Sequence, residues 1–494
     1  GGIVCTYLLI PYLDTFQASA GLAILNFVVC LVLLAPDRKT RLSHKATLAI
    51  LSGLITVTGY LALAGQVGQL HRHSISMQWK DQNVVHYQNS HYSNICIIEN
   101  QGQYTFFLDG IPSIITPVPD IPFVEGFVHI PLLAHPEPAE LLIVSGGAGG
   151  VINETLKHPS IAAVEYAELD PLLLDLFREY PTPLTESELN DSRVKIEHID
   201  GRLLLEATPN QYDVILVGIS EPSSLQTNRF FTIEFFSLAG ERLNKGGILV
   251  IGLPGSLTYE NEELKNLNSC VFNTLRSVFS YVRVIPGDGT NLFLASDSRD
   301  ISAIDRTQIV ERLSQRDIKA EVVVPWAIEK RLHRGWEDWF YRYVEGSTQR
   351  INSDFNPVGV YYSISHWNAL FAPSLRWLFR RFERMNLWTM VLLVVVFLLL
   401  YLFFRSRNVR LLPSEILLSI VTTGFAGMAF DLVLIFAFQS ICGYVFSWIG
   451  ILVASFMAGA ACGAMLITPF LARIKICSTN PPISSGTPFS RPSS

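Results

Sequence analysis

The stretch LLIVSGGAGGVINETLKHPSIAAVEYAELDP, residues 141–171, decides the fold. A short apolar run leads into four glycines within five positions, and an acidic cluster closes the stretch. A strand that ends in a glycine-rich turn and opens a helix lets backbone N–H groups approach a ligand closely. The third glycine of the dinucleotide fingerprint GxGxxG is missing, which argues against NAD. We therefore expect a nucleoside beside Gly146, Gly147 and Gly149, with Glu168 binding its ribose from about twenty residues further on.

The region around this turn reads as two successive parts. From 139 to 298, apolar strands alternate with helical stretches, which indicates an α/β fold with a parallel sheet covered on both faces. Before it, we expect a small β-domain at 68–138, because residues 74–115 alternate apolar and polar side chains, with a turn at Asp109-Gly110, as short antiparallel strands do. Residues 299–385 are charged and are expected to form a helical extension.

Apolar segments flank this region on both sides. The chain of 494 residues is 49% hydrophobic and 16% charged, whereas soluble domains are about 25% charged. A helix needs roughly 20 apolar residues to cross a bilayer. We predict transmembrane helices within 1–67, as a truncated N-terminal bundle, and within 386–472, followed by a disordered tail at 473–494. The lipid bilayer is thus an expected partner. The segments that meet the length are 18–35, 46–66, 387–404, 414–438 and 446–470.

Charge and cysteine usage exclude other classes of protein. The net charge of −6 offers no basic face for nucleic acid, so no nucleic-acid partner is expected. The seven cysteines show neither CxxC nor Cys/His spacing, so neither a metal site nor a disulfide framework is predicted.

Five motifs, taken in order, resemble the spermidine synthase family of polyamine aminopropyltransferases. The resemblance covers residues 74–297. It implies a Rossmann-like methyltransferase fold with a small N-terminal β-domain, here inserted between transmembrane helices as in bacterial membrane proteins with such a fused domain. The motifs are FVHIPLLAHP (127–136), SGGAGG (145–150), AELDP (167–171), IDGR (199–202) and DVILVGISEPSSLQTNRFFTIEFF (213–236).

The resemblance implies ligands and roles for particular residues. The expected ligand is an S-adenosylmethionine-type nucleoside, with decarboxylated S-adenosylmethionine as co-substrate and a small-molecule amine as acceptor. Glu168 matches the acid that binds the ribose, and Asp200 with Gly201 matches the pair that contacts adenine. The family also implies a homodimer.

The same comparison of motifs reveals departures. Ala148 replaces the aspartate of the glycine turn, and Gly218 replaces the first aspartate of the catalytic loop. A diamine is doubly cationic at neutral pH, so its pocket should be rich in carboxylates. Glu221, in place of the second aspartate, and Glu125, which is kept, are then the acids left to bind or deprotonate an amine. Glu221-Pro222 is equally compatible with an ordinary turn.

Two further polar residues follow the catalytic loop. Gln226 and Arg229 fall in the segment that shapes the acceptor pocket in the family, which makes them candidate substrate-binding residues. The alternative is an ordinary helix start, and the sequence leaves both open.

The side of the membrane that the central region faces is also open. The loops 37–45, 405–410 and 471–475 are basic, and the positive-inside rule would then place the central region outside the cell. The nucleosides that the family uses are cytosolic, which favours the cytosolic face of a bacterial inner membrane.

Three functions remain in competition. The first is a membrane-bound, spermidine-synthase-like transferase. The second is a catalytically reduced module that binds a nucleoside and regulates the membrane part. The third is a transporter, which is suggested by Asp431 within a predicted span, where a charge is costly.

Overall fold

The computed structural model describes residues 12–34, 42–90, 92–258, 261–303, 305–383, 385, 387–406, 415–442 and 446–478. Most of the predicted tail, 479–494, and the opening residues 1–11 lie outside the described residues, as do parts of two basic loops. The chain divides into two compact units. One comprises residues 1–71, 424–435 and 446–494, and the other comprises 72–423 and 436–445.

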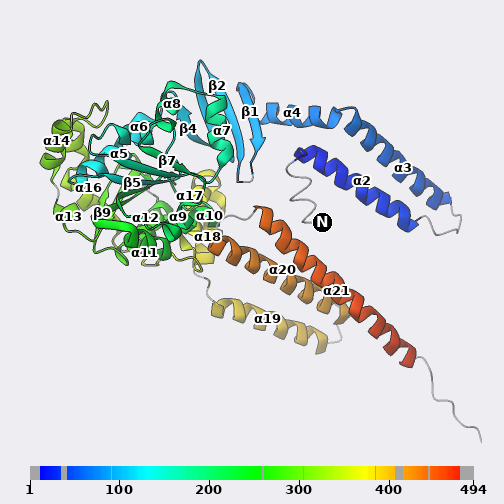
Figure 1. Cartoon of the computed structure of the whole chain (residues 1–494). Helices are drawn as coiled ribbons and strands as arrows, with labels where there is room; N and C mark the ends of the chain where they lie inside the picture. The colour runs from blue at the N-terminus through cyan, green and yellow to red at the C-terminus, as the bar shows by residue number, and fades with distance from the viewer. Residues whose placement is uncertain are drawn as a thin grey trace, which may run out of the picture. The chain divides into compact units, whose positions relative to one another are not determined.

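A small antiparallel sheet opens the second unit (Figure 1). Its strands follow one another in chain order, and the predicted turn at Asp109-Gly110 joins the last two with φ of 52° and 81°. Its buried face joins the main core, where the rings of Phe106 and Phe177 lie 4.7 Å apart. The strands are β1 Val84–Asn89, β2 Asn94–Asn100, β3 Gln103–Leu108 and β4 Ile111–Thr116.

A seven-stranded sheet forms the centre of the same unit, in the order β10-β11-β9-β8-β5-β6-β7. Strands β5 to β9 are parallel, and β11 runs antiparallel to both of its neighbours. The order reverses between β5 and β8, the switch point where doubly wound sheets bind ligands. The antiparallel strand inserted near one edge is the Rossmann-like methyltransferase arrangement, so the predicted fold class is confirmed. The strands are β5 Glu140–Val144, β6 Ala163–Ala167, β7 Val194–Glu197, β8 Tyr212–Val217, β9 Leu243–Gly255, β10 Tyr281–Ile285 and β11 Gly289–Ser296.

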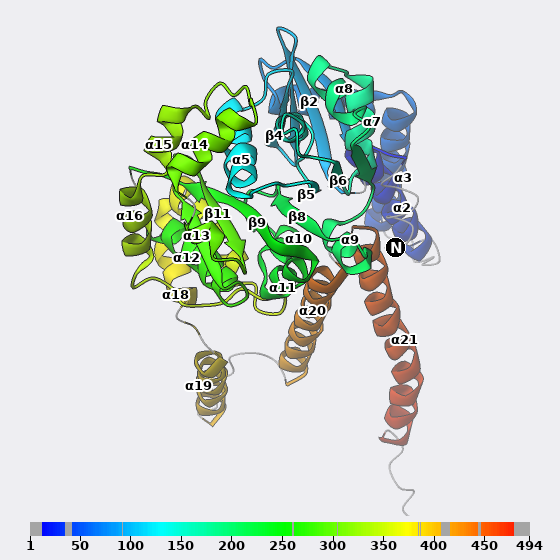
Figure 2. The same cartoon turned by 60° about the vertical axis from the view of Figure 1, so that its left-hand side comes forward.

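Helices cover both faces of this sheet (Figure 2). Successive side chains of a strand point to opposite faces, and Ile143 and Leu142 accordingly belong to two different hydrophobic cores. One core includes α5, α6 and α7, and the other includes α11 and α12. The helices are α5 Ile121–Ala134, α6 Val151–Leu156, α7 Pro171–Glu179, α8 Pro183–Leu189, α9 Gly201–Ala207, α10 Leu225–Asn228, α11 Ile233–Arg242 and α12 Glu262–Arg276.

The helical extension docks onto the domain through charged side chains. The guanidinium groups of Arg312 and Arg316 donate to carbonyl oxygens at the end of α5, from Leu132 to Pro136. These carbonyls have no partner inside their own helix. Helix α17 packs on α12 through a third hydrophobic cluster that includes Tyr362. The extension contains α13 Asp300–Ala303, α14 Arg306–Gln315, α15 Pro325–Arg331, α16 Arg334–Val344, α17 Val358–Phe371 and α18 Arg376–Glu383.

Apolar helices occupy the two ends of the chain. By length and composition, four are able to cross a membrane, and a fifth is added if Pro373–Glu383 and Trp388–Phe403, which are bent by 94°, form one broken span. The four candidate spans lie within α2 Thr15–Leu34, α3 Leu42–Leu63, α20 Glu415–Cys442 and α21 Phe446–Ser478, and the second half of the bent pair lies within α19 Leu387–Ser406. The amphipathic helix α4, Gln66–Gln78, follows α3.

Candidate functional site

The glycine turn, Glu168 and Asp200 follow three adjacent parallel strands. The turn comes after β5, Glu168 after β6 and Asp200 after β7. The carboxyl ends of parallel strands meet at one edge of a sheet, and this edge is where such folds bind ligands. Backbone hydrogen bonds continue past the strand ends, from Ser145 N to Ala167 O at 2.9 Å and from Glu168 N to Glu197 O at 3.0 Å. The three segments are therefore held together in register.

Glycine is required at two points of the turn for different reasons. Gly149 has a φ of 87°, a conformation that L side chains rarely adopt. At Gly147 the limit is space, because a β-carbon there would lie 2.7 Å from the Tyr166 ring. The glycine turn is thus closely packed against the Tyr166 ring of strand β6.

Side chains of the domain itself accept the N–H groups of the turn. The Tyr166 hydroxyl accepts from Gly147 and Ala148. The carboxylate of Glu188, which is fully buried on α8, accepts from Gly149 N at 2.8 Å and Gly150 N at 2.6 Å. Sequence reasoning missed both acceptors. Tyr166 could have been found, since it stands two residues before Glu168 and so points to the same face of β6.

Glu168 lies beside the turn, linked to it through Tyr166. The Tyr166 hydroxyl donates to Glu168 Oε2 at 2.7 Å, and Asp170 N donates to Oε1 at 3.3 Å. Burial raises the pKa of Glu168, and the hydrogen bonds oppose that shift. The carboxylate has no basic partner among the described residues. It is therefore an acceptor in a water-poor place, as the binding of sugar hydroxyls requires.

Asp200 has both oxygens engaged. Oδ1 caps α9 by accepting from Arg202 N and Leu203 N at 3.0 and 3.2 Å. Oδ2 accepts from Arg229 Nη1 at 3.0 Å, and this ion pair is buried, with 5% and 2% of the two side chains exposed. Gly201 lies tightly against Val144, at the start of the turn. Arg229, a candidate substrate-binding residue in the sequence, forms this buried ion pair with Asp200 inside the domain.

Glu221 is held by the helical extension. Trp367 Nε1 donates to Oε1 at 2.6 Å, and Ser363 Oγ donates to Oε2 at 3.1 Å. The two donors are four residues apart on α17, so they share one face of that helix. Burial raises the pKa of Glu221, and the two hydrogen bonds lower it. These two donors follow Glu221 by 142 and 146 residues in the chain. No local sequence pattern predicts a contact over such a separation.

Gly218 meets the glycine turn backbone to backbone. A β-carbon at position 218 would overlap the Ser145 carbonyl oxygen and lie 3.1 Å from Gly146 Cα. The aspartate that the family resemblance would place here therefore does not fit this backbone.

The two remaining predicted residues are Glu125 and Gln226. Both oxygens of Glu125 accept backbone N–H groups of residues 321–323, at 2.6 to 2.9 Å. Glu125 thus anchors the extension, and its carboxylate is not left free for an amine. Gln226 is half-buried in α10.

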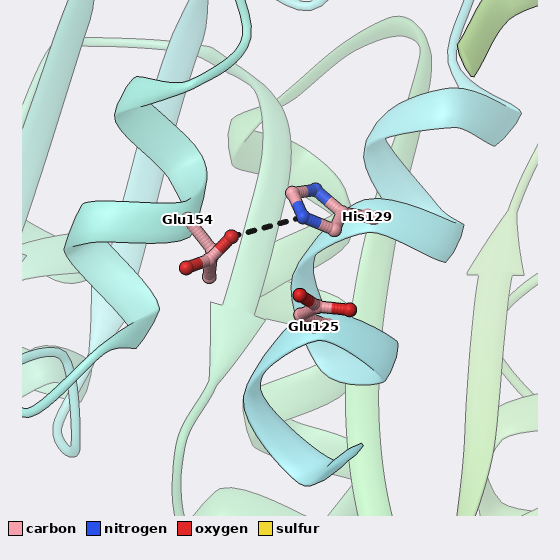
Figure 3. A group of neighbouring side chains, drawn as sticks. All are labelled: Glu125, His129 and Glu154. Atoms are coloured by element: carbon pink, nitrogen blue, oxygen red, sulfur yellow. Dashed lines mark hydrogen bonds and ion pairs between the residues drawn. The ribbon is translucent and has the colours of Figure 1, made fainter. Parts of the chain in front are cut away.

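Glu125, His129 and Glu154 form a candidate metal centre, with ligand atoms within 4.8 Å of one another (Figure 3). A chain of hydrogen bonds through His158 explains the position of His129 without a metal ion. Because the Arg316 guanidinium near His158 Nδ1 can only donate, His158 must donate to His129 Nδ1, and His129 Nε2 then donates to Glu154. His129 is left without a lone pair for a metal ion. The cluster fits a structural network better than a metal site.

A family model and curated relatives match the central part of this chain. Residues 122–303 match the spermine/spermidine synthase domain. The polyamine aminopropyltransferase of Oceanobacillus iheyensis is 29% identical over 255 residues, which are 51% of this chain and 49% of that protein. The enzyme of Bacillus subtilis is 36% identical over 145 residues, 29% of this chain and 51% of the other. The chain spans about half the length of these curated relatives.

Solved spermidine synthases are similar to the same region. A spermidine synthase in complex with the transition state analogue AdoDATO is 23% identical, with a TM-score of 0.46, covering 53% of this chain and 88% of that one. The enzyme of Thermotoga maritima is 22% identical, with a TM-score of 0.44, covering 53% and 87%.

Proposed function

Because residues 122–303 match the spermine/spermidine synthase domain, we propose that this chain is a membrane-bound, aminopropyltransferase-like enzyme. Its donor is an S-adenosylmethionine-type nucleoside, with decarboxylated S-adenosylmethionine as the co-substrate. Its acceptor is a small amine. Glu168 binds the ribose, Asp200 and Gly201 lie against the adenine, and Glu221 serves the acceptor.

One observation carries the nucleoside part of the proposal. Glu168 is buried next to the glycine turn, it is tied to that turn through Tyr166, and it has no cationic partner among the described residues. A buried carboxylate without a counter-ion is costly unless its function needs it. Two ribose hydroxyls would supply the missing donors. The Tyr166 hydroxyl donates to Glu168 Oε2. When the ribose binds, this hydrogen bond either stays in place or is replaced by one from a ribose hydroxyl.

The chemistry of transfer assigns a role to Glu221. The neutral amine nitrogen attacks the methylene carbon beside the sulfonium, the C–S bond breaks, and methylthioadenosine leaves. The nitrogen loses one proton, and Glu221 is the carboxylate that accepts it. Burial raises the pKa of Glu221, which makes it a stronger base than an exposed glutamate.

A second function is favoured by the geometry of Gly218. Since the chain has no room for a carboxylate there, the acceptor pocket contains fewer charges than an amine of high positive charge needs. The alternative is a nucleoside-binding module that regulates the membrane part without transfer.

Calorimetric titration of the detergent-purified full chain tests nucleoside binding. The ligands are S-adenosylmethionine, its decarboxylated form and methylthioadenosine. Glu168→Gln is expected to weaken binding by about tenfold or more, since it removes a charge-assisted pair of hydrogen bonds. Asp175→Asn, on the exposed face of α7, is the control and should leave binding unchanged. If both variants bound the nucleosides with equal affinity, Glu168 would not be part of the nucleoside site.

Transfer of radiolabel from the decarboxylated donor to a panel of amines separates the two functions. Loss of transfer in Glu221→Gln, with nucleoside binding retained, supports the enzyme. Nucleoside binding without transfer to any amine supports the regulatory module.

We also propose that the chain resides in a bacterial inner membrane with residues 72–383 on the cytosolic face, where the donor nucleoside is made. Four candidate spans support the membrane location. Protease digestion of inside-out and right-side-out vesicles tests the side. Cleavage of this region in right-side-out vesicles alone would contradict it.

A further inference from the structure

A cavity of about 600 Å³ is lined by none of the residues to which the proposed function assigns a role. Its walls come from the start of α5, from the ends of β9 and β10, and from residues 322–336 of the extension. Its volume is within the range of about 300–1,000 Å³ that is typical of small-molecule sites.

The cavity is at the ligand-binding edge of the sheet. Leu257 follows the end of β9, and Pro286 to Gly289 connect β10 to β11. Strands β9 and β10 both run antiparallel to β11, so they are parallel to each other and to β5. Their carboxyl ends therefore share the edge on which the glycine turn lies, but several strands away from it.

The cavity contains two basic residues for which the described chain provides no acidic partner. Arg331 is half-buried, its Nε has no hydrogen-bond acceptor, and no ion pair forms with it or with Lys330 among the described residues. Burial alone lowers the pKa of Arg331. Gly126 makes room for the guanidinium, since a β-carbon there would overlap it.

The two acids of the cavity, Asp120 and Asp288, form no ion pair with these cations in the described structure and bind backbone N–H groups instead. Asp120 accepts from Phe123 N at 3.2 Å as the N-cap of α5, and Asp288 accepts from Leu257 N at 2.7 Å. Both carboxylates thus stabilise the backbone of the walls. A partly buried guanidinium without a partner is less stable than a paired one, so an anion that enters the cavity would find a preformed counter-charge in Arg331.

Aromatic rings supply the rest of the surface. Phe123 stacks on Phe127 with centroids 5.4 Å apart, and Trp326 and Trp336 line the cavity from the extension. Trp326 is 70% exposed, as expected of a ring at the mouth of an open site. The match to the synthase domain ends at residue 303. Both basic residues and both tryptophans lie beyond it, so this wall belongs to the chain's own extension.

We propose that this cavity binds a small organic anion, a carboxylate or phosphate attached to an aromatic or apolar body. The guanidinium of Arg331 and the ammonium of Lys330 hold the charged group, and the rings of Phe123, Trp326 and Trp336 contact the body. The inference is independent of the proposed nucleoside site, because it uses none of its residues.

Calorimetry on the detergent-purified full chain tests the proposal with three probes that each contain a phenyl ring: 3-phenylpropionate, phenyl phosphate and the cation 3-phenylpropylamine. Inorganic phosphate is the fourth probe. We expect the two aromatic anions to bind and the amine to bind at least about tenfold more weakly. Tighter binding of the amine would overturn the proposal, and equal binding of inorganic and phenyl phosphate would overturn the role of the rings.

Variants locate the binding. Arg331→Met keeps the apolar stem and removes the charge, and it should weaken both aromatic anions about tenfold or more. Lys330→Gln, at an exposed side chain whose loss does not threaten folding, should weaken them less. Arg334→Gln, an exposed arginine outside the cavity, is the matched control. Anion affinity that is the same in Lys330→Gln, Arg331→Met and the control would overturn the assignment, whereas nucleoside binding should be unaffected in all three.

Discussion

Gly218 stands where the resemblance to spermidine synthases would place an aspartate, and the backbone explains the difference. The loop after β8 contacts Ser145 and Gly146 directly, so position 218 has no space for a side chain. We predict that Gly218→Asp neither creates nor improves transfer activity and lowers the free energy of unfolding by about 1–3 kcal/mol, the usual range for overpacking. Thermal unfolding and the radiolabel assay measure the two effects. Gly240→Ala, in a helix with ordinary room around it, is the control glycine and should be neutral or stabilising. A stable, more active aspartate variant would show that the loop opens readily.

The burial of Glu168 predicts that nucleoside affinity depends on pH. Because burial raises its pKa, the carboxylate takes up a proton at a pH above the ordinary glutamate range of about 4.3. The ionised form accepts ribose hydroxyls, so nucleoside affinity should fall as pH decreases through that raised pKa. Titrations from about pH 8 down to about pH 5 on the unmodified chain and on Glu168→Gln should show this fall in the first and a flat, weak profile in the second. Parallel profiles in both would assign the titration to another group.

Helix α17 donates two hydrogen bonds to Glu221, although it lies outside residues 122–303, which match the synthase domain. Its residues Ser363 and Trp367 donate to both carboxylate oxygens and thereby favour the charged form. If Glu221 is the base for the amine, Trp367→Phe should raise its pKa further and shift the acid limb of the pH–rate profile to higher pH. A helix that merely packed there would change the rate equally at all pH values. The matched variant Trp326→Phe, at a tryptophan that does not contact Glu221, should leave the limb in place.

The elements that the sequence predicts well are those with a local pattern. The apolar runs from LLIVS onward became strands of the central sheet, parallel from β5 to β9 and antiparallel at β11, and Asp109-Gly110 became the turn of a hairpin, because each signal is contained in a few neighbouring residues. The acceptors of the turn amides could not be predicted in the same way. Glu188 reaches Gly149 from 39 residues further on, and such a contact depends on how α8 packs. Of the candidate site, the glycine turn and Glu168 were found together, whereas Arg229 and Glu125 proved to be engaged within the domain.

At the scale of the whole second unit, the extension is an integral part of the domain. Arg312 and Arg316 cap α5, Glu125 binds residues 321–323, and Arg202 forms a two-pronged ion pair with Asp354 at 2.7 and 2.9 Å. Removing one partner of a buried charged pair leaves the other unpaired, which costs about 3–5 kcal/mol. Asp354→Asn should therefore lower the unfolding midpoint of the full chain far more than Asp338→Asn, an exposed aspartate of α16. Similar midpoints would mean that the extension is dispensable.

The stability of the whole domain should depend on pH through two buried groups with opposite signs. Burial raises the pKa of Glu188 to about 7, so the folded state holds a proton that the unfolded state has released above its ordinary value. Its contribution to the free energy of unfolding is complete below about pH 4.3 and is lost as pH rises to about 7. The loss amounts to roughly 3 kcal/mol. Burial lowers the pKa of His158 to about 2, so the unfolded state takes up a proton below about pH 6.5 and stability falls as pH decreases from there.

Replacing each group separates the two contributions. Glu188→Gln keeps a side-chain oxygen for the turn amides but cannot ionise, so its stability relative to the unmodified chain should increase as pH rises from about 5 to about 8. Glu186→Gln, at an exposed position of the same helix, should follow the unmodified chain throughout. His158→Gln should lose less stability than the unmodified chain below about pH 6. Denaturant midpoints measured across this range test all three. If Glu188→Gln and Glu186→Gln showed the same dependence on pH, the carboxylate would be ionised in the folded state at every pH tested, and the turn amides would then outweigh the cost of burying its charge.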